Sequence, residues 1–348
     1  MPFRAQLHHH RRVLHNGVTG LGSLLPTEES VCMSVTNAPV TKLTSPTDIV
    51  AMIPYVLGFI PEHSLVLVAL EGPHQRFGPV MRLDLPENSR EAAEQVDYLL
   101  ALVDAHKFRG VIVVAYTDDP RRSGSLVRPL LRRLKRARIS VSEALRADGE
   151  RWYSYTCHKV CCPASGVPYQ ADNTAPAAQA VYSGLTRADS RDALRAMFDP
   201  APPEAVADLE RDCRVLLAEP EACRPDDREI RRLLEDVDDC EPRHLATLLA
   251  LAQDETWIAE FLMAMTRFTA QRHFDIWRSV MCVAPPDLMA GPGALAAFAA
   301  WLDGHGVLAS HACDRVEEMA PGHSLIVMVR SLLDHTVPPY VWDEIVGD

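Results

Sequence analysis

The sequence predicts an α/β domain with a mixed sheet covered by helices, followed by an all-α domain. Three observations predict this architecture. Strand-length apolar runs alternate with helical patterns in the first half, turn residues join two pairs of these runs, and the strand signal stops near Ala175. At 348 residues the chain is long enough for two domains. We place the α/β domain at residues 41–170 and the helical domain at residues 171–348.

Residues 1–40 show no sustained periodicity, and we expect them to form a disordered extension. Met33 is an alternative start, because the sequence after it leads directly into the first element. His8, His9 and His10 offer metal ligands, but we favour an unstructured tail. Glycines interrupt any signal-peptide core in this region.

The first helix is predicted to begin at Pro46. Ser45 or Thr44 suits the N-cap, proline suits the first helical position, and Asp48 complements the positive end of the helix dipole. Pro54 is expected to kink this helix or end it early, because proline lacks the amide that a helix interior needs. Gly58 is the expected stop.

The remaining elements of the α/β domain follow in order. We expect one hairpin before a pair of helices that flank a buried strand, and a second hairpin after them. In residue numbers, the hairpin strands are Leu65–Leu70 with Pro79–Leu85 and Ile139–Leu145 with Arg151–Thr156, the helices are Glu87–Phe108 and Pro120–Ala137, and the buried strand is Gly110–Tyr116.

The second half is predicted to be helical throughout. Small residues recur on two successive helices near its end, which is typical of a tetratricopeptide-like helical pair; they are Ala296, Ala299, Ala300, Ala309 and Ala312, with Pro321 after them. Helices are expected at 175–182, 190–198, 203–218, 226–238, 242–253, 256–269, 274–283, 293–302, 307–319 and 323–333.

Composition narrows the classes of function. A formal net charge of −12 argues against general nucleic-acid binding, which depends on Lys and Arg neutralising phosphates. The 47% hydrophobic share comes without any apolar run long enough to span a bilayer, so we expect a soluble protein without a membrane partner. The nine cysteines are odd in number and mostly scattered, which favours a reducing cytoplasm over a disulfide framework.

Three thiols and an imidazole follow the last predicted strand, as Cys157, His158, Cys161 and Cys162. These four side chains match the ligand types of tetrahedral zinc sites, so zinc is a candidate cofactor. The spacing is not that of a common zinc finger, and adjacent cysteines have difficulty pointing at one metal ion. We therefore favour a reduced, packed cluster or a redox-labile pair over zinc.

A second candidate site lies where the Gly110–Tyr116 strand meets the next helix. Asp118 and Asp119 would be the catalytic carboxylates there, and Arg121, Arg122, Ser123 and Arg82 would bind an anion. Paired carboxylates at this position suit metal-assisted chemistry on a phosphorylated or other anionic small substrate. We favour the alternative that Asp-Asp-Pro forms a turn and helix cap, and that the arginines are solvated.

The corner Gly58–Ser64 contains Glu62 and His63, and its expected role is to turn the chain from helix into sheet. In a simple parallel sheet this corner would lie at the edge opposite the Asp118 loop.

Five segments carry a family resemblance: YVLGFIPEHSLVLVAL, VMRLDLP, VVAYTDDP, RWYSYTCHKVCCPASGVPY and ALAAFAAWLDGHGVLASHACDRVEEMAPGHSL. In this order, from about Leu43 to Trp342, they resemble the actinobacterial domain-of-unknown-function family 4192. The resemblance implies no particular reaction. This sequence departs from the family pattern at Ile60 and His63, inside the Gly-Phe-Pro-Ser corner.

Several catalytic motifs are absent from the sequence, namely GxxxxGK[ST], GxGxxG between strand and helix, HExxH and GxSxG. Our leading hypothesis is therefore a non-catalytic binding or regulatory protein in the cytoplasm, which contacts a protein partner through its helical domain. The alternative is the metal-assisted enzyme at Asp118 and Asp119.

Overall fold

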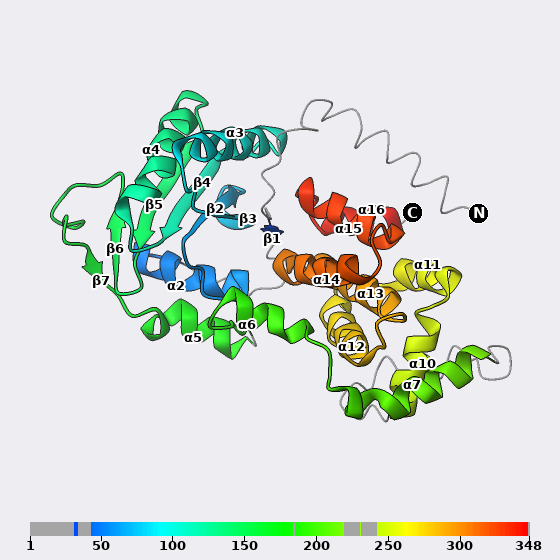
Figure 1. The fold of residues 1–348 in the computed structure, drawn as a ribbon. Coiled ribbons are helices and arrows are strands. Elements are labelled where there is room, and N and C mark those ends of the chain that lie inside the picture. Colours follow the sequence, from blue (N-terminus) through cyan, green and yellow to red (C-terminus); the bar gives the residue numbers. More distant parts are fainter. Residues whose placement is uncertain (1–30, 34–42, 184, 219–229, 231–241, 347–348) are drawn as a thin grey trace. The chain divides into compact units, whose positions relative to one another are not determined.

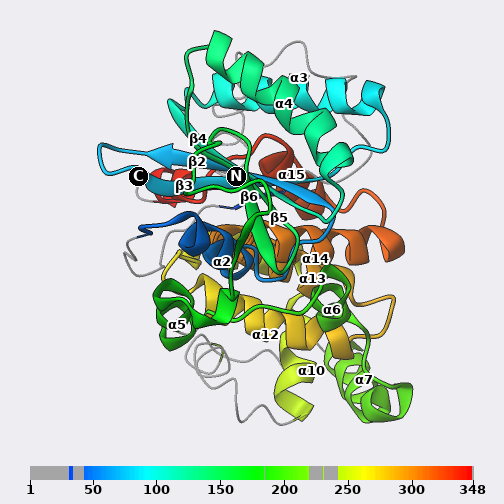
Figure 2. The same cartoon turned by 90° about the vertical axis from the view of Figure 1, so that its left-hand side faces the viewer.

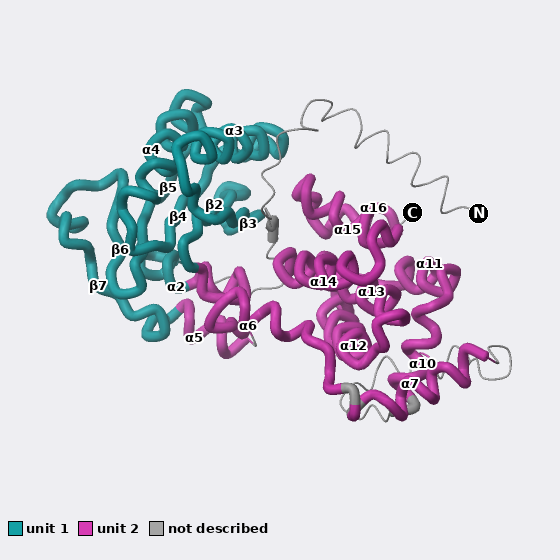
Figure 3. The backbone as a smooth tube through the Cα atoms, in the orientation of Figure 1, with its two compact units in different colours: residues 1–30, 43–51, 62–175 teal, residues 31–42, 52–61, 176–348 magenta. Residues whose placement is uncertain are grey.

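The computed structural model describes residues 31–33, 43–183, 185–218, 230 and 242–346 (Figure 1). They form two compact units (Figure 3). Unit 1 holds residues 43–51 and 62–175, and unit 2 holds residues 31–33, 52–61 and the described residues from 176 onward. Most of the expected N-terminal extension and of the predicted helix 226–238 lies outside the described residues. None of the helices in the described part is long and apolar enough to cross a membrane.

A mixed sheet forms the centre of unit 1, as the sequence predicted. The strands that belong to unit 1 lie in the order β3-β2-β4-β5-β6-β7. Strand β2 runs antiparallel to both β3 and β4, β4 runs parallel to β5, and β5 and β6 form the second predicted hairpin. The strand bounds are β2 Ser64–Glu71, β3 Arg76–Asp84, β4 Gly110–Tyr116, β5 Ser140–Ala147, β6 Arg151–Ser154 and β7 Val167–Pro168.

Helices α3 (Ser89–Ala105) and α4 (Pro120–Arg136) cover one face of the sheet (Figure 2). Alternate strand residues such as Leu65, Leu67 and Val113 pack against them in a continuous core. The intervening strand residues, which include Val66 and Val114, are also buried. Both faces of the central strands are therefore covered, which explains why the strands are apolar at every position.

Helix α2 (Pro46–Leu57) continues through Pro54, so the expectation of an early end at this proline was wrong. Proline at position 54 cannot donate to the carbonyl of Val50, one helical turn earlier. The hydroxyl of Tyr116 donates to that carbonyl instead, at 2.8 Å. A side chain from β4 thus replaces the missing helical hydrogen bond.

The edge expected for the corner before β2 was also wrong. Strands β3 and β4 are connected through α3 and run in the same direction, but β2 lies between them and runs in the opposite direction. Ser64, at the start of β2, therefore pairs with both Asp84 and Tyr116, which lie at the ends of β3 and β4. The corner and the Asp118 loop share one edge of the sheet.

Unit 2 is helical, as predicted, apart from the short strand β1 (Val31–Met33). Its central helix is α13, on which every residue from Gly291 to Leu302 is buried. Helix α13 packs against α12 and α14, and the tetratricopeptide-like relation of α13 to α14 stays a prediction. The helices are α5 Ala175–Tyr182, α6 Arg191–Arg195, α7 Pro203–Ala218, α10 Pro242–Leu251, α11 Glu255–Ala264, α12 Ala270–Val283, α13 Ala290–Leu302, α14 Gly306–Met319, α15 Ser324–Asp334 and α16 Tyr340–Val346.

Unit 2 also takes in a segment from early in the chain, residues 52–61. Phe59 forms a parallel bridge with Ala188. The amide of Ile60 donates to the carbonyl of Ala188 at 3.1 Å, and the amide of Ala188 donates to the carbonyl of Gly58 at 2.7 Å. Because Phe59 is 1% exposed, this segment is part of the packed interior.

Candidate metal centre and strand-end cluster

Asp119 is the N-cap of α4. Its carboxylate accepts hydrogen bonds from the amides of Arg121 and Arg122, at 2.8 and 3.0 Å. These two hydrogen bonds hold the pKa of Asp119 below its ordinary value, and the bond from the Arg122 amide has the larger effect. Asp118 and the side chain of Arg121 are exposed. The carboxylate of Asp119 therefore serves the first turn of a helix.

Arg82 and Arg122, two of the other predicted anion ligands, make contacts within the protein. Arg82 is 5% exposed, donates from Nε to the Oγ of Ser64 at 3.0 Å, and forms an ion pair with Asp84. Arg122 donates to the carbonyl of Pro86 at 3.0 Å and to that of Leu85. Both guanidinium groups hold the ends of the strands together.

The structure brings further polar groups to this edge. His63 Nδ1 lies 3.3 Å from the Oγ1 of Thr117, and the hydroxyl of Tyr155 donates to the buried Ser123 at 2.9 Å. These groups lie where β2 begins and β3 and β4 end, and we call them the strand-end cluster; they are His63, Ser64, Arg82, Thr117, Asp119, Arg122, Ser123 and Tyr155.

Sequence reasoning missed Arg146, a buried cation on β5. Its Nη1 donates to the carbonyl of Thr117 at 3.0 Å and lies 3.8 Å from a carboxylate oxygen of Asp148. Its guanidinium also stacks 3.8 Å from the ring centroid of Tyr153. The sequence signal for it is its position inside the apolar run Ala144–Ala147. An arginine there is expected to be buried, and a buried cation needs hydrogen-bond or ion-pair partners.

Cys157, Cys161 and Cys162 converge in the loop between β6 and β7, and we call this the thiol loop (residues 155–166). The Sγ atom of Cys161 lies 3.7 Å from that of Cys157 and 3.8 Å from that of Cys162. All three sulfur atoms lie within 4.8 Å of one another. His158 is exposed and is not part of this group.

The thiols of Cys157 and Cys162 do not ionise alike. The pKa of Cys157 is lowered, mainly because the amide of Lys159 donates to its sulfur. The pKa of Cys162 is raised to about 12, by desolvation and by the neighbouring thiols. A bound divalent cation would offset the repulsion between neighbouring thiolates.

Backbone contacts anchor both ends of the thiol loop. The amide of Cys157 donates to the Oγ of Ser154 at 2.9 Å, and the amide of Cys162 donates to the carbonyl of Lys159 at 2.9 Å. Gly166 has a φ of +76°, and a Cβ there would lie 2.6 Å from the ring of Tyr153. The chain therefore needs glycine where it returns to the sheet.

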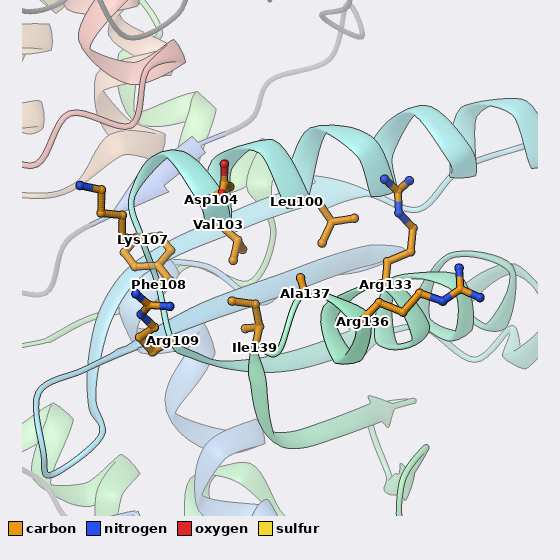
Figure 4. A pocket seen from close by; sticks show the side chains of 10 residues that line it. All are labelled: Leu100, Val103, Asp104, Lys107, Phe108, Arg109, Arg133, Arg136, Ala137 and Ile139. Atoms are coloured by element: carbon orange, nitrogen blue, oxygen red, sulfur yellow. The ribbon is translucent and has the colours of Figure 1, made fainter.

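A cavity of about 420 Å³ lies between the C-terminal ends of α3 and α4 (Figure 4). Leu100, Val103, Phe108 and Ile139 contribute apolar lining. Three cations, Lys107, Arg109 and Arg136, also line the cavity. None of them forms an ion pair with a carboxylate of the described residues. In this respect it differs from the strand-end cluster, in which the buried Arg82 is paired with Asp84. The basic residues in the last turn of α4, Arg133, Lys135 and Arg136, were the sequence signal for this cationic cavity.

A family model described as "Domain of unknown function (DUF4192)" matches residues 46–340. Since this match covers most of the chain, the protein belongs to that family, as the five quoted segments predicted. No curated protein and no solved structure matches the chain.

Proposed function

We propose that this protein is a binding or regulatory protein without catalytic chemistry. One observation carries the proposal: the polar groups of the strand-end cluster bond to the protein itself. Asp119 caps a helix, Arg82 donates to Ser64, and Arg122 donates to the carbonyl of Pro86. A catalytic site needs such groups aimed at a substrate. The same contacts weigh against the alternative, a metal-assisted enzyme that acts on an anionic small substrate at Asp118 and Asp119.

The partner in this proposal is a protein that contacts the helical unit. Phe268, in the loop between α11 and α12, is 89% exposed, and Tyr340, at the start of α16, is 51% exposed. An ion pair between Arg267 and Asp343 connects this loop to α16 at 2.5 Å. Exposed aromatic side chains are enriched where proteins bind one another, which supports an interface here.

Cross-linking of the full-length protein in its native cells, followed by mass spectrometry, tests this function. The substitution Phe268→Asp is expected to remove the cross-linked partner. Val215→Asp, on α7 of the same unit, is the matched control, because Val215 is also exposed, at 59%. A partner that cross-links equally to both variants would contradict the proposal, as would the lack of any partner above background. Unchanged thermal unfolding must accompany both substitutions.

We also propose zinc as the cofactor of the thiol loop, a cytoplasmic location and an actinobacterial source. The convergence of three thiols supports zinc, since thiolates are preferred zinc ligands. Cys157, Cys161 and Cys162 are free, which suits a reducing compartment.

The net charge of −12 supports a protein partner rather than a nucleic acid. Native mass spectrometry under reducing conditions tests zinc, whose mass increment should disappear in Cys161→Ser.

A further inference from the structure

We infer that the thiol loop holds zinc through three protein ligands only, Cys157, Cys161 and Cys162, and leaves the fourth position open for a neutral nitrogen donor such as an imidazole. This inference rests on the zinc proposed above and defines how that zinc is coordinated and what it can bind.

Two of the three sulfur–sulfur distances match those expected at a shared tetrahedral centre. A zinc–sulfur bond of about 2.3 Å and tetrahedral angles place two ligand sulfurs about 3.8 Å apart. The two distances from the sulfur of Cys161 are 3.7 and 3.8 Å. Two sulfurs in a disulfide lie only about 2.05 Å apart. Cys161 is therefore spaced from each of the other two thiols as ligands of one ion are and not as in a disulfide, and the third pair of sulfurs lies within 4.8 Å.

Hydrogen bonds within the loop fix this arrangement. The hydrogen bonds of the Cys157 and Cys162 amides fix the backbone on both sides of the cluster. Arg151 donates to the carbonyls of Ser165 and Gly166, at 3.2 and 3.0 Å, and so ties the end of the loop to β6. Because the ligands are positioned beforehand, metal binding has little chain to order.

No fourth ligand of the usual kind joins the three thiols within the described part of the chain. The converging group contains neither His158 nor a carboxylate. Cys161 is exposed, and Cys157 and Cys162 are partly exposed, so a ligand from solvent can reach the centre. Zinc sites with three protein ligands keep the fourth position for water or an exchangeable ligand.

The net charge of the zinc–thiolate centre favours a neutral ligand at the fourth position. Three thiolates around a divalent ion leave one net negative charge, and a fourth thiolate would add another in a chain that already carries −12. A neutral imidazole fills the position without added charge. Cys₃His is also a common zinc ligand set.

Cobalt(II) is the probe for the test, because its absorption reports the number of thiolates and the geometry around the metal. The reduced, metal-free full-length protein is titrated with cobalt and then with imidazole. We expect charge-transfer bands of three thiolates and a saturable shift of the d–d bands on addition of imidazole. Each Cys→Ser change at the three positions should weaken cobalt binding by roughly a hundredfold or more.

Two variants make the result specific. His158→Ala should retain the cobalt affinity, the spectrum and the imidazole response. Cys282→Ser, a partly exposed cysteine outside the loop, should do the same. Circular dichroism shows whether each variant is folded.

Three outcomes would overturn the inference. A loss of cobalt affinity in His158→Ala would mean a closed Cys₃His site, and a spectrum that ignores imidazole would mean a filled fourth position. Both leave zinc binding itself intact. Failure of the wild-type protein to take up cobalt or zinc would overturn the zinc proposal as well, while the cross-linking of a partner through Phe268 would stand independently.

Discussion

The hydroxyl of Tyr116 donates a hydrogen bond to the carbonyl of Val50 at 2.8 Å, and this is the carbonyl that Pro54 leaves without a donor in α2. Tyr116 and Val50 are both buried. Burial also raises the pKa of Tyr116 well above its ordinary value, so its hydroxyl stays protonated and remains a donor.

We expect Tyr116→Phe to destabilise the protein by about 1–3 kcal/mol, because a buried carbonyl loses its donor. In the background of Pro54→Ala, the amide at position 54 can bond to Val50 itself, so the same change should cost less. A double-mutant cycle measured by urea denaturation checks this coupling. Strictly additive effects would show that the two residues do not serve the same carbonyl.

The cap at Asp119 predicts a stability effect that depends on pH. Asp119→Ala should lower the melting temperature at pH 7, whereas Asp119→Asn should preserve it, because asparagine also caps helices. The folded-state pKa of Asp119 lies below the unfolded value, so its contribution is present above about pH 4 and is lost as the pH falls through the folded pKa. Melting curves from pH 3 to 7 measure this. An Asn variant as unstable as the Ala variant would contradict the cap.

His311 on α14 should make the protein sensitive to acid. It is 4% exposed, neither ring nitrogen has a hydrogen-bond partner among the residues that the structure describes, and burial lowers its pKa to about 4. The unfolded histidine takes up a proton near pH 6.5, so stability is complete above that value and falls between pH 6.5 and 4, by on the order of 1–3 kcal/mol. The groups that face it are the ring of Phe198, the carboxylate of Asp314 and the cations Arg191, Arg195 and Arg330.

The variant His311→Leu should lose this part of the pH dependence and be at least as stable as the wild type at pH 7. Urea denaturation at pH 5 and pH 7 gives the comparison. His273, whose pKa burial also lowers to about 4, is present in both proteins and so cancels in the difference. Identical pH profiles would refute the assignment to His311.

Two helical glycines should respond to alanine in opposite ways. A Cβ at Gly291 would lie 1.8 Å from the carbonyl oxygen of Ala252, so Gly291→Ala should destabilise unit 2 by about 1–3 kcal/mol or more. A Cβ at Gly124 would meet only the Arg128 side chain, at 3.5 Å, so Gly124→Ala should stabilise α4 by roughly 0.5–1 kcal/mol. Thermal unfolding of both variants provides the measurement, and equal signs would count against the packing at α13.

Local patterns were sufficient to predict most of the elements. The strand Gly110–Tyr116 and the helix Pro203–Ala218 match their predicted bounds, because hydrophobic periodicity, caps and proline are all local signals. Helix α16 was not predicted, since only seven residues carry its pattern.

Errors arose where distant residues decide the outcome. The direction of β2 depends on its insertion between two strands that α3 connects, and nothing within β2 encodes that choice. Likewise, Pro54 is tolerated only because Tyr116, 62 positions later, supplies a donor. At the candidate sites, the sequence identified the three cysteines and Asp119, but it could not show that Arg82 faces Asp84 or that His158 stands apart from the thiols.

The bridge between Phe59 and Ala188 has a consequence for synthesis on the ribosome. About 130 residues must be added after Ile60 before its partner Ala188 exists, and at roughly 5–20 residues per second this is a delay on the order of 6–25 s. During that interval the apolar segment 52–61 has left the ribosome without its final neighbours. The nascent chain should therefore be a substrate for chaperones that hold exposed apolar segments, and slow translation between these two positions should lengthen that dependence.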